Sequence, residues 1–223
     1  MDFLSLIPML PELALAILCL CLLLIGVFRG DDGTEMLTGL TVLCLVTVAA
    51  MTIGSMWAAD MKMVAFDGIF VSSPFTAFIK VIVLAAAAIS LTISLRYMQT
   101  EGMYRIEFPV LVALATLGMM LMVSAGSLLM LYVGLELQSL ALYVLAAFRR
   151  DSERSSEAGL KYFVLGALAS GLLLYGISLV YGFTGSIDFA KIATALADGS
   201  ASDPAIILGF LFILSAMAFK ISA

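Results

Sequence analysis

Hydrophobic residues occur along this chain in long uninterrupted blocks, separated by short polar segments. The blocks reach roughly 18 residues or more, the length that an α-helix needs to cross the hydrocarbon core of a bilayer. They lack the alternating pattern of a β-barrel, and backbone groups in lipid must be hydrogen-bonded internally, so the blocks predict helices. We expect seven spans, at Leu6–Val27, Met36–Ala58, Pro74–Leu95, Phe108–Val123, Leu128–Phe148, Ala158–Gly182 and from Ala205 onward.

The segments between the predicted spans are of two kinds. Short polar loops such as "RGDDGTE", "SAGS" and "RRDSERSSE" join most of the spans. The links at 59–73 and 183–204 are longer and less polar. The second link contains "SIDFAKIATALA", in which Ile187, Ala190, Ala193 and Leu196 recur at helical spacing. This pattern predicts a short helix along the membrane surface.

Composition strengthens the membrane assignment and excludes several kinds of site. Hydrophobic residues make up 63% of the chain and charged residues only 12%, about half the share in a soluble domain. The sequence shows no basic patch for nucleic acid. It has no histidine, which excludes a His-ligated haem or a His-based metal site in this chain. A proton relay would therefore use carboxylates, lysines, hydroxyls and water. The three cysteines, Cys19, Cys21 and Cys44, lie in apolar spans and are interpreted as inert thiols.

Positive residues in the loops predict the orientation in the membrane. They are concentrated after the odd-numbered spans, and cytoplasmic loops are the ones enriched in lysine and arginine. The N-terminus is therefore expected on the outside, which in a bacterium is the periplasm. The residues after odd-numbered spans are Arg29, Arg96, Arg105, Arg149, Arg150 and Arg154, whereas those after even-numbered spans are Lys62 and Lys191.

The last predicted span, "AIILGFLFILSAMAFKISA", stops directly after a lysine without a loop or a helix stop signal. This ending predicts that the chain is the N-terminal part of a longer polypeptide.

Four ionisable residues were identified inside the predicted spans: Lys80, Glu136, Lys161 and Lys220. Lys80 is six residues into its helix, where a long side chain can reach the outer interface, so snorkelling or simple packing is expected. For Lys161, snorkelling competes with a functional role, and the functional role gains if the helix begins near Ser152.

Glu136 lies too deep for its side chain to reach water. It is eight residues from one end of its predicted span and twelve from the other, about 12 to 18 Å of helix. One interpretation is a protonated acid that hydrogen-bonds between helices. The alternative is a hydrated site, because Tyr132, Ser139 and Tyr143 share the helix face of Glu136.

Lys220 is the expected partner of Glu136, which we identified as the only deep acid. At an effective dielectric constant near 20, such a pair at 4 Å interacts by about 4 kcal/mol. Moving one charge through 100 mV costs about 2.3 kcal/mol. Making or breaking the pair could therefore drive proton uptake or release. By contrast, Gly166 and Ser170 in "LGALASGLLLYG" are interpreted as a packing motif without chemistry of its own.

The central block "LLMLYVGLELQSLALYVLAAFRRDSERSSEAGLKYFVLGALASGLLLYGISLVYGFTGSIDF" resembles the N-subunit family of bacterial NADH-quinone oxidoreductase (respiratory complex I), the equivalent of a mitochondrial subunit. "PELALAI", "SSPFTAFIKVIVL" and "AMAFKISA" fit the same family, so the resemblance covers nearly the whole chain.

The resemblance implies an all-α integral membrane protein with the antiporter-like fold, in which three leading helices precede two inverted five-helix repeats. Residues 1–100 would supply the leading helices, and residues 101–223 would begin the first repeat and stop within its fourth helix. It implies proton translocation through Glu136, Lys220 and Lys161. NAD, FMN, iron–sulfur clusters and quinone would belong to partner subunits, and neighbouring antiporter-like subunits and lipid would surround the chain.

Two other functions stay open at this point. The chain could belong to a multisubunit sodium/proton antiporter or a membrane-bound hydrogenase, which share the antiporter-like fold. It could also be a structural membrane scaffold whose charges only stabilise packing.

Overall fold

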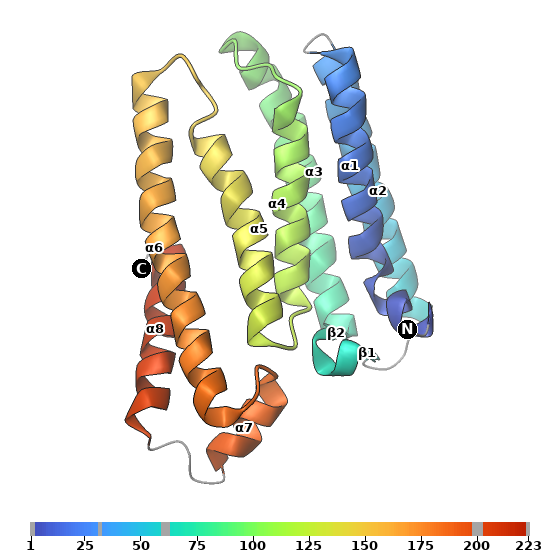
Figure 1. Cartoon of the computed structure of the whole chain (residues 1–223). Helices are drawn as coiled ribbons and strands as arrows, with labels where there is room; N and C mark the ends of the chain where they lie inside the picture. The colour runs from blue at the N-terminus through green and yellow to red at the C-terminus, as the bar shows by residue number, and fades with distance from the viewer. Residues whose placement is uncertain (1–2, 31–32, 59–62, 198–202, 222–223) are drawn as a thin grey trace.

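The computed structural model describes residues 3–30, 33–58, 63–197 and 203–221. They form a bundle of long helices that run alternately up and down (Figure 1). The helices are η1 (Phe3–Met9), α1 (Leu10–Arg29), α2 (Thr34–Ala58), η3 (Phe66–Gly68), α3 (Pro74–Thr100), α4 (Glu107–Val123), α5 (Leu128–Ala146), α6 (Glu153–Thr184), α7 (Phe189–Ala197) and α8 (Pro204–Lys220). A short hairpin adds β1 (Met63–Ala65) and β2 (Phe70–Ser72).

The predicted all-α membrane bundle is confirmed. Among the described residues, five helices are long and apolar enough to cross a membrane: η1 with α1, then α2, α3, α5 and α6. The helices α4 and α8 are shorter but also apolar. The expected surface segment forms α7. The sixth predicted span is longer than expected, because α6 already begins at Glu153.

Polar side chains fix where several helices begin. Ser73 Oγ accepts a hydrogen bond from the Thr76 amide, the Ser73 amide donates one to Thr76 Oγ1, and Pro74 follows in the first turn of α3. Ser127 caps α5 and Ser152 caps α6 in the same manner. The start of α6 at residue 153 therefore follows from a capping serine, although the apolar run begins five residues later.

The hydrophobic core is divided between two groups of helices. One cluster packs α1, α2, α3 and α4 together and includes Leu15, Leu45, Leu84 and Met120. A second cluster, with Leu173, Val180 and Ile213 among its members, joins α5, α6, α7 and α8. Glycine allows α6 and α8 to approach closely, because a Cβ at Gly176 would lie 2.6 Å from the Gly209 carbonyl oxygen.

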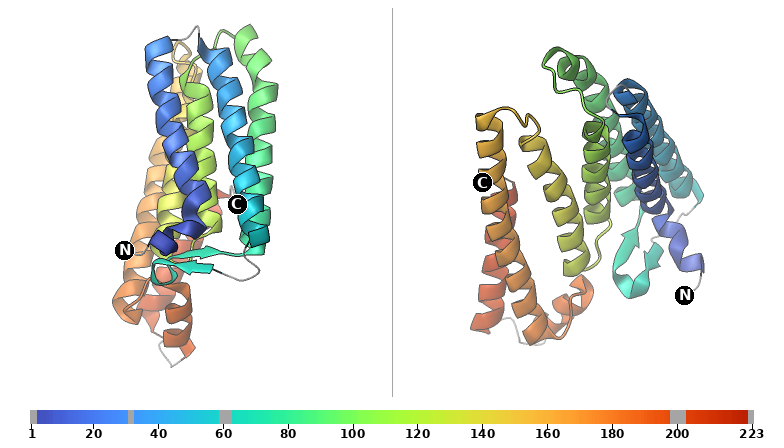
Figure 2. Two further views of the ribbon diagram at one scale, coloured as in Figure 1. Left: turned by 90° about the vertical axis from the view of Figure 1, so that its right-hand side faces the viewer. Right: turned by 45° about the horizontal axis from the view of Figure 1, so that its top comes forward.

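One end of the bundle carries a layer of irregular structure, which we call the end layer: residues 63–72 of the hairpin, 124–127 between α4 and α5, and 185–188 between α6 and α7. Backbone hydrogen bonds connect its parts. The Gly126 amide donates to Ile69, the Val71 amide to Ser124, and the Leu128 amide to Ile187. Figure 2 shows the hairpin at this end of the molecule, beside η1 and the start of α3. The sequence analysis did not predict the hairpin.

Candidate functional site

The helices α5, α6 and α8 bring the predicted acid and lysine together. Lys220 Nζ lies 3.5 Å from Glu136 Oε1, although the two residues are far apart in the sequence. Lys220 is the last residue of α8, and Figure 1 shows that this helix ends about half way along α6. The Glu136 side chain is 23% exposed and the Lys220 side chain 9%. The geometry therefore contains the expected contact, whereas the role of these residues in proton transfer stays a prediction.

Two hydroxyls of α5 give the Lys220 ammonium group further partners. The ammonium group donates to Ser139 Oγ at 2.7 Å and to Tyr143 Oη at 3.2 Å. Both residues lie on the same face of α5 as Glu136, as their spacing predicts. Tyr132 belongs to the same stripe, but it packs against the apolar cluster around Leu128 and Leu173. The hydroxyls of this stripe that contact Lys220 are therefore the two that follow Glu136 in α5.

Ser170 of α6 completes the site from the opposite side. Its hydroxyl donates a hydrogen bond to Glu136 Oε1, the oxygen that faces Lys220. Ser170, interpreted from the sequence as a packing residue, therefore also hydrogen-bonds the acid. Its position in a small-residue motif concealed the hydroxyl. Ser170 is four residues after Gly166 and shares its helix face. Because this face packs closely against a neighbouring helix, a polar side chain on it was a candidate partner for the acid.

Gly166 allows Tyr143 to reach the site. A Cβ atom at this position would overlap the Tyr143 hydroxyl and ring. The ring is further held in edge-on contacts with Tyr162 and Phe163, at centroid distances of 4.8 and 5.7 Å. Gly166 and the two aromatic rings of α6 thus fix the orientation of a tyrosine that contacts Lys220.

Lys161 lies elsewhere on α6. Its ammonium group contacts Glu157 Oε1, one turn earlier on the same helix, at 2.6 Å. The lysine and glutamate side chains are 70% and 62% exposed. The structure therefore does not bring Lys161 into contact with Glu136 or Lys220, and its functional role stays a prediction.

Lys80 forms a buried ion pair with an acid, so the expectation that it snorkels or simply packs was wrong. Its Nζ lies 2.5 Å from Glu12 Oε1, and both side chains are at most 2% exposed. The sequence analysis overlooked Glu12, which lies inside the first predicted span, and therefore treated Glu136 as the only deep acid. A search for an acid opposite Lys80 in the leading helices would have found it.

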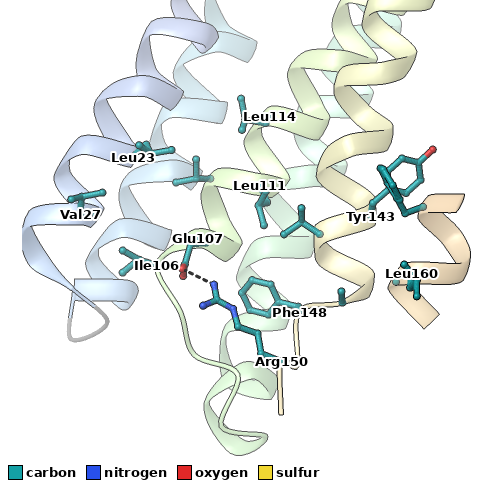
Figure 3. A pocket seen from close by; sticks show the side chains of 16 residues that line it. Leu23, Val27, Ile106, Glu107, Leu111, Leu114, Tyr143, Phe148, Arg150 and Leu160 are labelled. Atoms are coloured by element: carbon teal, nitrogen blue, oxygen red, sulfur yellow. Dashed lines mark hydrogen bonds and ion pairs between the residues drawn. The ribbon is translucent and has the colours of Figure 1, made fainter. Parts of the chain in front are cut away.

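An apolar groove runs between α1, α4, α5 and α6 and has a volume of about 680 Å³. Figure 3 shows Leu23, Leu111 and Leu114 along its length and an ion pair at one end. In this pair, Arg150 Nη2 lies 3.0 Å from Glu107 Oε1. In the part of the chain that the structure describes, histidine, cysteine, aspartate and glutamate form no group that could hold a metal ion.

Several known proteins have sequences related to this chain. The family described as "NADH:quinone oxidoreductase/Mrp antiporter, TM" matches residues 125–223. NADH-quinone oxidoreductase subunit N of Paramagnetospirillum magneticum is 50% identical over 99% of this chain and 45% of that protein. The subunit of the same name from Parvibaculum lavamentivorans is 52% identical over 97% of this chain and 44% of that protein. The chain thus spans less than half the length of these relatives.

Solved structures show the same relationship. A chain of respiratory complex I from Thermus thermophilus with bound aureothin matches 94% of this chain and 43% of its own length. Its TM-score is 0.72 and its sequence identity 30%. The Mrp complex from Dietzia sp. DQ12-45-1b has a TM-score of 0.71 over 99% of this chain and 41% of the other, with 22% identity, which shows a common fold. The resemblance found in the sequence is thereby confirmed: the chain is similar over nearly its whole length to proteins named NADH-quinone oxidoreductase subunit N, and it has the fold of antiporter-like membrane subunits.

Proposed function

We propose that this chain is part of a proton-translocating membrane-arm subunit of NADH-quinone oxidoreductase. The observation that carries the proposal is the placement of Lys220 between Glu136 and the hydroxyls of Ser139 and Tyr143. Homology to subunit N over nearly the whole chain supports it. Identity of about 50% to these relatives favours this function over a sodium/proton antiporter or hydrogenase subunit, because the likeness to the Mrp complex is one of fold.

The chemistry follows from the charges at the site. When Glu136 takes up a proton, its carboxylate becomes neutral and the attraction for the Lys220 ammonium group is lost. Ser139 and Tyr143 then still accept hydrogen bonds from the ammonium group, so the lysine keeps polar partners while the ion pair is open. An interaction of about 4 kcal/mol at an effective dielectric constant near 20 is comparable to the cost of moving a charge against the membrane potential. Opening and closing the pair therefore couples proton movement to changes elsewhere in the complex.

Several further assignments belong to the same proposal. The redox chemistry of NAD, FMN, iron–sulfur clusters and quinone is assigned to other subunits, and neighbouring antiporter-like subunits are the expected partners. The chain lies in the bacterial inner membrane with its N-terminus in the periplasm. Residues 1–100 form the leading helices, and residues 101–223 belong to the first repeat. Lys161 is proposed as a third proton-transfer residue.

The test is the variant Glu136→Gln in the full-length protein and the assembled complex. The amide keeps the shape of the side chain and is cheaper to bury than a charge, so the complex should assemble. Proton translocation in membrane vesicles and NADH–quinone turnover should decrease together, because the two are coupled. Glu136→Asp should have a milder effect. The matched control is Glu101→Gln, which changes an exposed glutamate that pairs with Arg149, a residue without a proposed role in proton transfer. Normal proton translocation in the assembled Glu136→Gln complex would refute the proposal and leave the scaffold function.

A further inference from the structure

The Glu12–Lys80 pair lies outside the region that the family match covers, and the proposed proton transfer does not use it. Glu12 is in the first turn of α1, and Lys80 is in the second turn of α3. Both helices begin beside the end layer, so the two charges lie within about two helical turns of it.

Glu12 depends on Lys80 for its polar contact, and an aromatic ring covers the lysine. Apart from the ion pair itself, the two Glu12 carboxylate oxygens have no hydrogen-bond partner among the described residues. The Phe70 ring packs against the lysine, with the ammonium group 5.0 Å from the ring centroid. A buried charge without its partner is costly, so each residue requires the other.

Phe70 connects the pair to the end layer. It is a residue of β2, it is 1% exposed, and it forms an antiparallel bridge with Ala125. On either side of this bridge, the Val71 amide donates to the Ser124 carbonyl at 2.9 Å, and the Gly126 amide donates to the Ile69 carbonyl at 2.8 Å. These bonds fix the loop from which α5 begins.

The start of α5 determines the position of Glu136. Ser127 caps this helix, which begins at Leu128, and Glu136 follows about two turns later. A shift of the loop at 124–127 would therefore move Glu136 relative to Ser170 and Lys220, which are held by other helices.

We propose that Glu12 and Lys80 are positioning residues for Glu136. Their ion pair fixes Phe70 and the end layer, and the end layer fixes the start of α5. The inference rests on the function proposed for Glu136, and it assigns no proton exchange to Glu12 itself.

The experiment compares single and double variants of the full-length protein in the assembled complex. Glu12→Gln and Lys80→Met each leave one buried charge unpaired, whereas the double variant leaves none. Hydrogen exchange of the amides at 69–72 and 124–128 reports the end layer, and the pH profile of proton translocation reports Glu136. In each single variant, amide exchange should become at least about tenfold faster, since breaking a buried pair is strongly destabilising. The pH profile should also change.

The double variant should return amide exchange to within about threefold of the original protein and restore the pH profile, because neither side chain then carries a buried charge and a neutral amide costs much less to bury. The matched control is the exposed pair at the opposite end of the bundle, with Glu107→Gln and Arg150→Gln, which should leave end-layer exchange unchanged. If the single variants fail to assemble, recovery of assembly in the double variant supports the inference, and its failure overturns it.

Two other outcomes also overturn the inference. One is unchanged end-layer exchange in the single variants. The other is a double variant with normal exchange that does not translocate protons, which would show that the pair itself exchanges protons. Amide exchange is measured independently of Glu136→Gln, so a failure of the proposed function would be recognised separately.

Discussion

Two lysine–glutamate pairs in the described part of the chain, one buried and one partly buried, have the same chemistry in different surroundings. Glu12 and Lys80 are in contact at 2.5 Å and are almost fully enclosed, with an aromatic ring beside the ammonium group. Glu136 and Lys220 are 3.5 Å apart and less completely buried, and three hydroxyls from α5 and α6 surround them.

This difference determines what each pair can do. Among the described residues, Glu12 has no hydrogen-bond partner outside its ion pair with Lys80, so separating the enclosed pair would leave a desolvated carboxylate without a polar contact. Hydroxyls can accept from an ammonium group or donate to a carboxylate, so the second pair can open without leaving either group unpartnered. The enclosed pair is suited to holding helices in place, and the hydroxyl-lined pair to changing its state.

The largest expected effect is that of Lys220→Ala. It leaves Glu136 without its cationic partner, and proton translocation should fall below about one-tenth of the original rate, at least as far as in Glu136→Gln. Lys220→Arg should not restore it, because arginine does not release its proton at accessible pH. Vesicle proton-uptake assays on assembled complexes measure the effect. Amide exchange in the end layer should stay at the rate of the original protein, whereas Lys80→Met should accelerate it. Faster end-layer exchange in Lys220→Ala would contradict the different roles assigned to the two pairs.

A smaller effect is expected from Gly166→Ala. The added methyl group overlaps Tyr143, and such overpacking costs about 1–3 kcal/mol, so Tyr143 should be displaced from Lys220. Proton translocation should decrease, with some loss of thermal stability of the complex. Gly171→Ala is the matched control, since a Cβ at this position of α6 meets no atom within 4 Å. Equal behaviour of the two variants would argue against a role for Tyr143.

Ser170→Ala tests the hydroxyl that faces Glu136. A hydrogen bond to a charged group contributes about 1.5–3 kcal/mol, so the pH at which proton translocation is half-maximal should shift while assembly is preserved. Ser94→Ala is the control, because the side chain of this serine donates to the Leu91 carbonyl of its own helix and has no other hydrogen bond to a described residue. A pH profile identical to that of the original protein would show that Ser170 does not influence Glu136.

The smallest structural effect is expected from Lys161→Ala. An exposed pair one turn apart on a helix contributes about 0.3–0.5 kcal/mol, so the thermal stability and assembly of the complex should hardly change. A decrease in proton translocation would then reflect proton transfer by Lys161 rather than damage to the fold. Translocation equal to that of Glu101→Gln and of the original protein would contradict the proposed role.

The long helices and the Glu136–Lys220 contact were accessible from the sequence for simple physical reasons. An uninterrupted apolar run can only be satisfied as a helix in lipid, and a deep acid requires a partner. Glu12 was overlooked because it stands near the beginning of its span, beside Pro11, where a polar residue resembles part of a helix start. The hairpin has strands of three residues, too short for a pattern of alternation, although "FDG" contains the Asp-Gly pair typical of a tight turn.

The length of α6 has a consequence for the membrane around the protein. Its 32 residues extend for roughly 48 Å, whereas the hydrocarbon core of a bilayer is about 30 Å thick. The excess must be accommodated by tilt or by projection of the first turns, which carry Glu153, Arg154 and Glu157, beyond the hydrocarbon region. Because α6 also holds Ser170 against Glu136, a change in the tilt of this helix would alter the surroundings of the acid. Under the proposed function, the thickness of the host bilayer would therefore affect proton transfer, since lipids with longer acyl chains would bring the charged turns of α6 closer to the hydrocarbon region.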